Sequence, residues 1–225
     1  EGGVRVPCMV AGPDIDKAVR DDLISGIDLA ATTLRMAGIA RPAAMQGRDI
    51  FGDNFNRKFV ISARDRCDYT IDKIRAVTTQ RYKYICNYLT DRPYMQPQYR
   101  DARPITKQLR AAAKNGDLDQ VQMQFYGDTR PAEEFYDLQA DPHEIRNLAK
   151  NPGVRMQLQQ HRQLLANWIK NTGDLGQTAE SDASLRDVLA RWQAKCVNPE
   201  YTPVRKRIAV ENASKHRVLI LGDSI

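Results

Sequence analysis

The segment Glu134–Leu148, which reads EFYDLQADPHEIRNL, constrains the fold more than any other part of the chain. Its aromatic and aliphatic start, Phe135–Leu138, is typical of a short strand. Asp141 then offers a side-chain oxygen to a helix N-terminus, and Pro142 suits the first helical position because no N–H donor is needed there. Glu144 follows Asp141 at capping-box spacing. The segment therefore predicts a strand, a tight turn and one capped helical turn.

Four other stretches have the composition of strands. Val4–Ala11 reads as a buried strand closed by a Gly-Pro turn, and Phe59–Ala63 is a short apolar strand. Apolar and polar residues alternate in Ile74–Val77 and again in Tyr82–Tyr88, with a turn between the two runs, which predicts a hairpin. This hairpin and Phe135–Leu138 together predict a small antiparallel sheet.

Helical spacing of apolar residues occurs on both sides of these strands. From Leu23 to Ala37 the apolar residues share one face, and Gly38 is placed to end the helix. A second helix follows Asn151-Pro152 and ends at Gly173. We expect it to cover the sheet with one apolar face, on which His161 is a packing residue and not a ligand. That face comprises Val154, Leu158, His161, Leu165, Trp168 and Ile169.

Length and composition exclude several classes of protein. The 225 residues suffice for one or two domains with a core, and no apolar run approaches the roughly 18–20 residues of a membrane span. The net charge of +6 is spread along the chain, and the basic patches lack the regular aromatic residues of a nucleic-acid groove. Residues 100–130 are basic and polar and are expected at the surface. The four cysteines are far apart without a Cys-x-x-Cys pair, so we predict no metal site. From the absence of a long apolar run and of a nucleic-acid groove, we also predict no membrane partner and no nucleic-acid partner.

Four stretches, in this order along the chain, resemble the C-terminal part of the sulfatase family. They are EGGVRVP at residues 1–7, the helix and loop of residues 21–50, IRAVTTQRYKYI at residues 74–85, and FYDL with DPHE and NL at residues 135–148. Residues 28–32 lack the proline that the family has at this point. The RPY sequence at residues 92–94 and the helix with Trp168 look most like sulfamidase-type, heparan N-sulfatase-like members.

The resemblance implies an α/β (α+β) fold, namely the C-terminal portion of an alkaline phosphatase-like sulfatase fold. Residues 1–172 would form the C-terminal part of the sulfatase domain. Within it, residues 1–50 would end the main α/β domain. Residues 57–172 would form a small antiparallel-sheet subdomain packed by a C-terminal helix.

The resemblance also implies hydrolysis of sulfuric esters or sulfamates on a sulfated carbohydrate, by a periplasmic or secreted protein. In the family an oxidised Cys or Ser attacks sulfur, and a calcium ion stabilises the sulfate charge. The Cys/Ser-x-Pro-x-Arg motif is absent from this sequence, so the calcium ligands and the nucleophile are expected in a missing N-terminal half. We therefore expect the chain alone to be inactive. Two alternatives stay open: another phosphohydrolase of the alkaline phosphatase superfamily, and a non-catalytic glycan-binding fragment.

The candidate substrate-binding residues are Arg64, Asp65, Arg66 and Asp68, in a loop expected after the strand Phe59–Ala63. An arginine there can bind sulfate through two parallel bonds, and an aspartate can accept hydrogen bonds from sugar hydroxyls. The alternative is an internal Arg–Asp ion-pair cluster that only shapes the loop.

The end of the chain has a different character. Residues 173–215 are polar and are expected to form a linker that includes a helix over Ser184–Lys195. Val218–Leu221 reads as a buried strand, and the Gly-Asp-Ser that follows resembles the first block of the SGNH (GDSL) hydrolases. Residues 216–225 would then begin such a domain, with Ser224 as candidate nucleophile.

Overall fold

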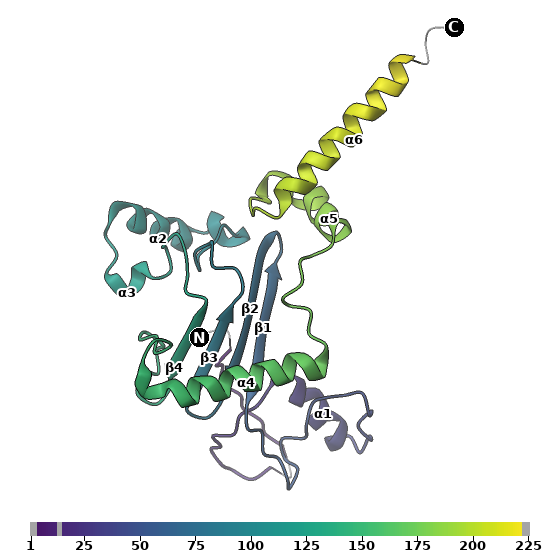
Figure 1. The fold of residues 1–225 in the computed structure, drawn as a ribbon. Coiled ribbons are helices and arrows are strands. Elements are labelled where there is room, and N and C mark those ends of the chain that lie inside the picture. The colour runs from purple at the N-terminus through teal and green to yellow at the C-terminus, as the bar shows by residue number, and fades with distance from the viewer. Residues whose placement is uncertain (1–3, 13–14, 222–225) are drawn as a thin grey trace. The chain divides into compact units, whose positions relative to one another are not determined.

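The computed structural model describes the backbone of residues 4–12 and 15–221, with side-chain environments as far as Ala213. The helices are α1 (Gly26–Met36), α2 (Pro104–Asn115), α3 (Gln120–Met123), α4 (Arg155–Thr172), α5 (Asp182–Trp192) and α6 (Tyr201–Leu221) (Figure 1). The strands are β1 (Val60–Cys67), β2 (Thr70–Thr78), β3 (Tyr82–Asn87) and β4 (Glu133–Asp137).

The described residues divide into two compact units. The first contains the chain up to Ala63, then Ile74–Asn87 and Pro131–Asp174. The second contains Arg64–Lys73, Tyr88–Arg130 and the chain from Leu175 onward. These limits differ from the boundaries expected from the sequence, because β1 and β2 each contribute residues to both units.

The described strands form one sheet in the order β1-β2-β3-β4. β2 and β3 pair antiparallel with Val77 opposite Tyr84, and β3 and β4 pair antiparallel with Tyr84 opposite Phe135. The predicted hairpin, its pairing with the Phe135 strand and the α+β class are confirmed.

Helix α4 lies across the sheet of the first unit (Figure 1). Leu158 and Leu165, each 4% exposed, pack against a cluster of buried sheet residues, Val77, Tyr84 and Phe135. Trp168 is only partly buried against the same cluster. Gly173 ends the helix with φ +66, a conformation that glycine adopts without strain. The covering helix is therefore confirmed, with Leu165 more deeply buried than Trp168.

His161 is a packing residue of this interface, as expected. It is 5% exposed, and its Nδ1 donates to the Gln157 carbonyl at 2.7 Å. A neutral ring then carries its acceptor at Nε2, which lies 3.1 Å from the Thr79 hydroxyl. Burial lowers the pKa of His161 from its ordinary value of 6.5.

Helix α1 is organised by one buried carboxylate, Asp28. Its Oδ2 accepts from the Ser25 N–H at 2.8 Å in a capping box, and its Oδ1 accepts from the Arg48 N–H at 2.8 Å. Arg57 forms an ion pair with the same carboxylate. The helix begins three residues after Leu23, because Ser25 provides the N-cap, and Gly38 follows its end with φ +69.

Two predicted elements of the first unit differ from the structure. Residues 4–11 form no strand, since Val4 and Arg5 lie in a turn and a bend, and Val6 and Met9 are 64% and 95% exposed. A strand needs a partner backbone, and none of the described residues offers one here. The turn after β4 continues without a helical turn. Asp141 instead accepts from the Arg146 N–H at 2.7 Å, and Glu144, at φ +55, directs its carboxylate to Lys83.

The second unit has a core that the sequence did not predict. Residues 173–215 do not form a linker: α5 and α6 bury Leu185, Val188 and Leu189 with Tyr69 and Ile71. Two ion pairs, Arg186–Glu211 and Arg207–Asp182, join the two helices. The strand expected at Val218–Leu221 is the last turn of α6. Ser224 lies outside the described residues.

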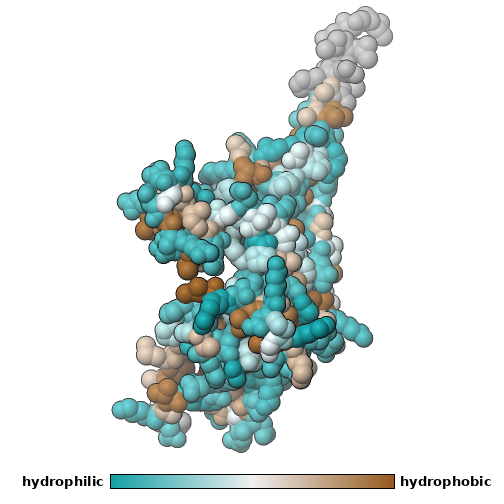
Figure 2. All heavy atoms as spheres, turned by 60° about the vertical axis from the view of Figure 1, so that its left-hand side comes forward, coloured by the Kyte–Doolittle hydropathy of each residue, from teal (hydrophilic) through white to brown (hydrophobic). Residues whose placement is uncertain are grey.

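The described helices include none with the length and apolar character that crossing a bilayer requires. On the face shown in Figure 2, hydrophilic residues predominate and hydrophobic side chains occur in small separate groups. Most of the buried apolar residues in the described part of the chain belong to the two cores.

Candidate functional site

The predicted loop Arg64–Asp68 is mostly strand. β1 extends to Cys67, and Asp68 occupies the turn into β2 at φ +50, a left-handed conformation that aspartate tolerates better than most residues. Because side chains alternate along a strand, Arg64 and Arg66 point to one face of β1 and Asp65 to the other. The strand therefore sets the spacing of the two arginines, which a flexible loop would not do.

Each arginine has an acidic partner from another segment of the second unit. Arg64 Nε lies 3.6 Å from Asp72 Oδ2, and Arg66 Nη1 lies 3.3 Å from Glu180 Oε2. The Arg64 side chain is 44% exposed, and Asp65 and Asp68 are exposed as well. The fold thus keeps the four candidate residues together at the end of one hairpin. It also supplies two carboxylates that the sequence analysis did not assign.

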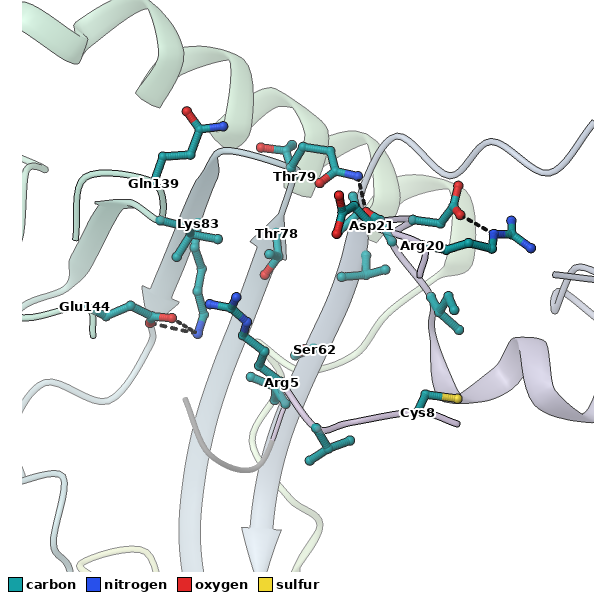
Figure 3. Close-up of a pocket in the computed structure, with 18 residues that line it drawn as sticks. Arg5, Cys8, Arg20, Asp21, Ser62, Thr78, Thr79, Lys83, Gln139 and Glu144 are labelled. Atoms are coloured by element: carbon teal, nitrogen blue, oxygen red, sulfur yellow. Dashed lines mark hydrogen bonds and ion pairs between the residues drawn. The ribbon is translucent and has the colours of Figure 1, made fainter. Parts of the chain in front are cut away.

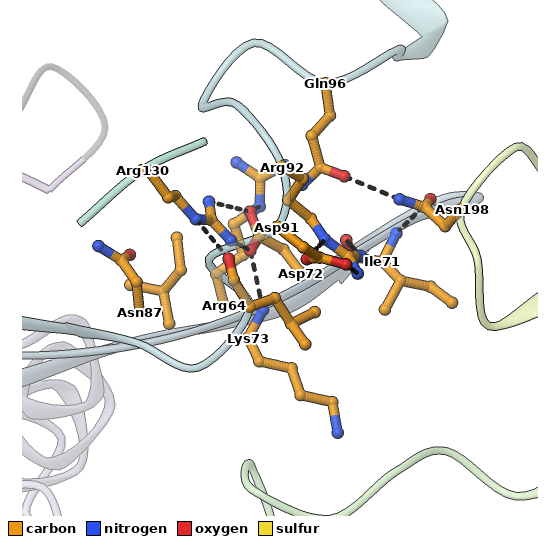
Figure 4. Close-up of polar contacts among 12 residues, drawn as sticks. Arg64, Ile71, Asp72, Lys73, Asn87, Asp91, Arg92, Gln96, Arg130 and Asn198 are labelled. Carbon is orange, nitrogen blue, oxygen red and sulfur yellow. Dashed lines mark hydrogen bonds and ion pairs between the residues drawn. The ribbon is translucent and has the colours of Figure 1, made fainter. Parts of the chain in front are cut away.

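Asp72 is the best anchored of these groups. Its side chain and that of Arg130 are each 1% exposed, and Arg130 binds both carboxylate oxygens, with Nη1 3.1 Å from Oδ2 (Figure 4). Arg130 Nε donates to the Leu89 carbonyl at 2.8 Å, and Asp72 Oδ1 accepts from the Lys73 N–H at 2.9 Å. A buried carboxylate is stable only with such complete pairing.

A second set of contacts fixes the surroundings of this pair. The Asn198 side chain accepts from the Ile71 N–H at 3.0 Å and donates to the Gln96 side chain at 2.8 Å (Figure 4). Arg92 donates to the Ile71 carbonyl at 3.2 Å and pairs with Glu200 at 2.8 Å. The start of β2 is thereby tied both to the loop after β3 and to the turn that precedes α6.

The sequence analysis did not assign Asp72 or Arg130 to the site. Asp72 carries one signal, because it is the one acidic residue of β2, whose sequence is TIDKIRAVT. Arg130 carries none, because it lies in the basic segment expected at the surface, yet it is 5% exposed. Only the tertiary structure brings these two residues together.

The first unit contains a cavity of about 600 Å³ between residues 4–24 and the sheet (Figure 3). Lys83 and Glu144 lie in its wall and pair at 2.8 Å, with side chains 6% and 9% exposed. Arg20 and Asp22 pair at 2.6 Å. The cavity also has hydroxyl and amide groups, from Ser62, Thr78, Thr79, Gln80 and Gln139. Most of the charged side chains in this cavity are paired with one another. The cavity is therefore a weaker candidate for anion binding than the arginines of β1 are.

The described residues contain no group of three or more His, Cys, Asp or Glu side chains that could hold a metal ion. The described residues therefore do not fit a metal centre.

Residues 1–101, somewhat less than half of the chain, match the family model "N-sulphoglucosamine sulphohydrolase, C-terminal". An ulvan-active sulfatase of Formosa agariphila is 35% identical over 187 residues, which cover 81% of this chain and 31% of that protein. A second ulvan-active sulfatase of the same organism is 26% identical over 196 residues, covering 77% of this chain and 34% of that protein.

Among solved structures, a 2-O GAG sulfatase is 24% identical with a TM-score of 0.46, over 68% of this chain and 26% of that one. The chain spans about a third of the length of the curated relatives that it matches. The family model spans the first three of the four stretches, and the first relative is similar over 81% of the chain. The chain therefore belongs to the sulfatase family, within the C-terminal part of its members.

Proposed function

We propose that this chain is the C-terminal part of a sulfatase that hydrolyses sulfate groups on a sulfated polysaccharide such as ulvan. The observation that supports this most is the 35% identity to an ulvan-active sulfatase over 81% of the chain. The sulfatase relatives imply a divalent metal in general, and we propose calcium, held elsewhere in the whole protein. Bound there, it would stabilise the charge on the sulfate oxygens.

The role proposed for the described residues is to bind the polysaccharide beside the reacting sulfate. Arg64 and Arg66 bind sulfate or carboxylate groups of the polymer, because a planar guanidinium matches two oxygens at once. Asp65 and Asp68 accept hydrogen bonds from sugar hydroxyls. Binding energy from such remote parts of a substrate lowers the barrier when it positions the reacting group.

The test is the release of inorganic ions by the whole enzyme that contains this chain. Ulvan and a phosphate monoester are incubated with it in parallel, and free sulfate and phosphate are measured by ion chromatography. We expect sulfate release from the polysaccharide. Phosphate release without sulfate release would favour a phosphohydrolase instead, and tight ulvan binding without either product would favour a non-catalytic glycan-binding role.

A further inference from the structure

The start of helix α2 carries three exposed cations, Arg100, Arg103 and Lys107, and none of them forms an ion pair with a described carboxylate. Their backbones link them turn by turn. The Arg103 N–H donates to the Arg100 carbonyl at 2.9 Å, and the Lys107 N–H donates to the Arg103 carbonyl at 3.1 Å. Residues one turn apart on a helix lie about 5–6 Å from each other. We call these three residues the basic stripe.

The chain around the basic stripe has few acidic residues. From Tyr99 to Asn115 it contains five cations and one carboxylate, that of Asp101. Asp101 pairs with Arg110 at 2.9 Å, so these two charges offset each other. Lys114 lies in the last turn of α2, close in sequence to Asp117, and is not part of the stripe. The three positive charges of the stripe are therefore not neutralised within this segment.

The other acidic residues of the second unit do not neutralise the stripe either. Most of them form ion pairs with other cations: Asp72 with Arg130, Asp91 and Glu200 with Arg92, Glu180 with Arg66, Asp182 with Arg207, and Glu211 with Arg186. Asp119 accepts from the Gln122 N–H at 2.8 Å, at the start of α3. Asp65, Asp68, Asp128 and Asp187 complete the set, and none of them forms an ion pair with the stripe.

The basic stripe begins beside the β1–β2 hairpin of the same unit. The Thr70 hydroxyl, at the start of β2, donates to the Pro97 carbonyl just before the stripe. Burial raises the pKa of Tyr69 in the hairpin, and the nearby charge of Asp101 adds to this effect. Figure 1 shows α2 leading away from the hairpin, and its 12 residues extend for about 18 Å. The stripe thus continues from the hairpin that carries Arg64–Asp68.

We propose that the basic stripe is a second binding surface for the sulfated polysaccharide, which contacts sugar units away from the reacting sulfate. The proposal rests on the proposed function and deepens it, because it adds a surface that only a long polymer reaches. The sulfate groups of a polymer recur along its length, so a row of exposed cations attracts them without one fixed geometry. The Tyr99 ring lies 4.9 Å from the Arg100 guanidinium and helps to orient it.

Linking weak contacts through one polymer strengthens binding without making any single contact strong. An exposed charge pair contributes little by itself in water. A polysaccharide already held at the hairpin meets the stripe at a high local concentration, so the weak contacts act together. The stripe is therefore expected to add affinity for long chains.

The test measures the dissociation constant of ulvan by surface plasmon resonance with the whole enzyme that contains this chain, which needs no catalysis. The stripe variant carries Arg100→Ala, Arg103→Ala and Lys107→Ala. The matched control carries alanine at three exposed cations of the first unit that also form no ion pair with a described carboxylate, namely Lys150, Arg155 and Lys170. Both variants lose three positive charges, so they differ only in where the charges are lost.

We expect the stripe variant to bind ulvan about tenfold more weakly than the wild type at low salt, because three exposed contacts are lost together. The matched control should stay within about twofold of the wild type. The difference between the stripe variant and the wild type should shrink as salt is added, because salt screens exposed charges. Equal weakening in the two variants, or unchanged affinity in the stripe variant, would overturn the proposal.

A charge-conserving variant separates loss of charge from damage to the fold. Arg100→Lys combined with Arg103→Lys keeps both positive charges on exposed side chains and should bind ulvan within about threefold of the wild type. A loss as large as that of the stripe variant would contradict a surface that acts through charge. A double-stranded DNA fragment is measured in parallel. Tighter binding of DNA than of ulvan, lost only in the stripe variant, would assign the stripe to nucleic acid instead.

Sulfate release from a sulfated disaccharide by the wild-type enzyme tests the proposed function separately. Sulfate release together with unchanged ulvan affinity in the stripe variant would contradict only the second binding surface. No sulfate release, together with the expected loss of affinity in the stripe variant, would contradict only the proposed function.

Discussion

Three aspartates with little exposure in this chain are each held by an arginine. In both units an aspartate with little exposure is paired with a guanidinium from a distant segment; the pairs are Asp28–Arg57, Asp72–Arg130 and Asp174–Arg75. Arginine suits this role because it stays charged and donates two parallel hydrogen bonds. Within the described residues, Arg64 differs from these three arginines, because nearly half of its side chain faces solvent.

The first prediction concerns Arg64 and Asp68 in catalysis by the whole enzyme. Arg64→Ala and Asp68→Ala are expected to lower kcat/KM for a glycan substrate by about tenfold or more, because each removes a bond made to the bound polymer. A small aryl sulfate does not reach these residues and should be hydrolysed nearly as before. The measurements are kcat/KM on both substrates by steady-state kinetics and the melting temperature of each variant. Equal losses on both substrates would assign the two residues to structure.

The second prediction concerns the pH dependence of stability at His161. Burial lowers its pKa below the ordinary 6.5, so the unfolded chain binds more protons than the folded chain between the two pKa values. Its contribution is therefore fully present above pH 6.5 and is lost as the pH falls through the folded pKa. We expect His161→Gln to have a smaller fall in melting temperature between about pH 7 and pH 5 than the wild type does. Parallel curves for the two proteins would show that His161 is not the titrating group.

At the scale of elements, α4 is the clearest case of a helix stabilised by the sheet that it covers. Its apolar face meets Val77, Tyr84 and Phe135 from three neighbouring strands. Arg162 adds an ion pair and hydrogen bonds to Glu133 on β4, and this contact lowers the pKa of the Glu133 carboxyl. Helix and sheet thus share both an apolar and a charged interface.

The third prediction concerns this interface. Leu165→Ala is expected to cost about 2–5 kcal/mol of unfolding free energy, because it leaves a cavity in a closed core. Trp168→Ala should fall at the lower end of about 3–5 kcal/mol, since Trp168 is only partly buried. Gln160→Ala, on the exposed side of the same helix, is the control and should change the free energy by less than about 0.5 kcal/mol. Denaturant unfolding measures all three, and a tolerated Leu165→Ala would contradict the packing.

At the scale of the whole molecule, the main question is which part of the protein carries the catalytic groups. The sequence has no Cys/Ser-x-Pro-x-Arg motif, and the described residues hold no metal-binding group. The relatives are about three times as long as the segment that matches this chain. In the function proposed above, the described units bind the polysaccharide around a reaction centre that the rest of the enzyme would supply.

The fourth prediction is that the chain by itself has no sulfatase turnover. Purified chain is assayed with an aryl sulfate and a sulfated disaccharide, with and without calcium. We expect sulfate release at the rate of buffer alone, because neither a nucleophile motif nor a metal site is present in the parts described. A rate of sulfate release above that of buffer, lost when calcium is removed, would contradict the prediction that the chain alone is inactive.

The sequence by itself determined the family, the β2–β3 hairpin, the Phe135 strand and the apolar face of α4. These features depend on short-range patterns: alternation along a strand, helical spacing on one face, and glycines such as Gly38 and Gly173 that take a positive φ after a helix. It also singled out Arg64 and Arg66, because two arginines and two aspartates in five residues are visible without a fold.

The tertiary structure alone decided which groups those arginines meet. Asp72 and Arg130 are 58 residues apart, and Arg66 meets Glu180 from the segment expected to be a linker. The tertiary structure also decided the core of α5 and α6, because their few apolar residues pack with Tyr69 and Ile71 of the β1–β2 hairpin. The physical reason is that pairing of a buried charge and closure of a core depend on distance in space, which local sequence patterns do not encode.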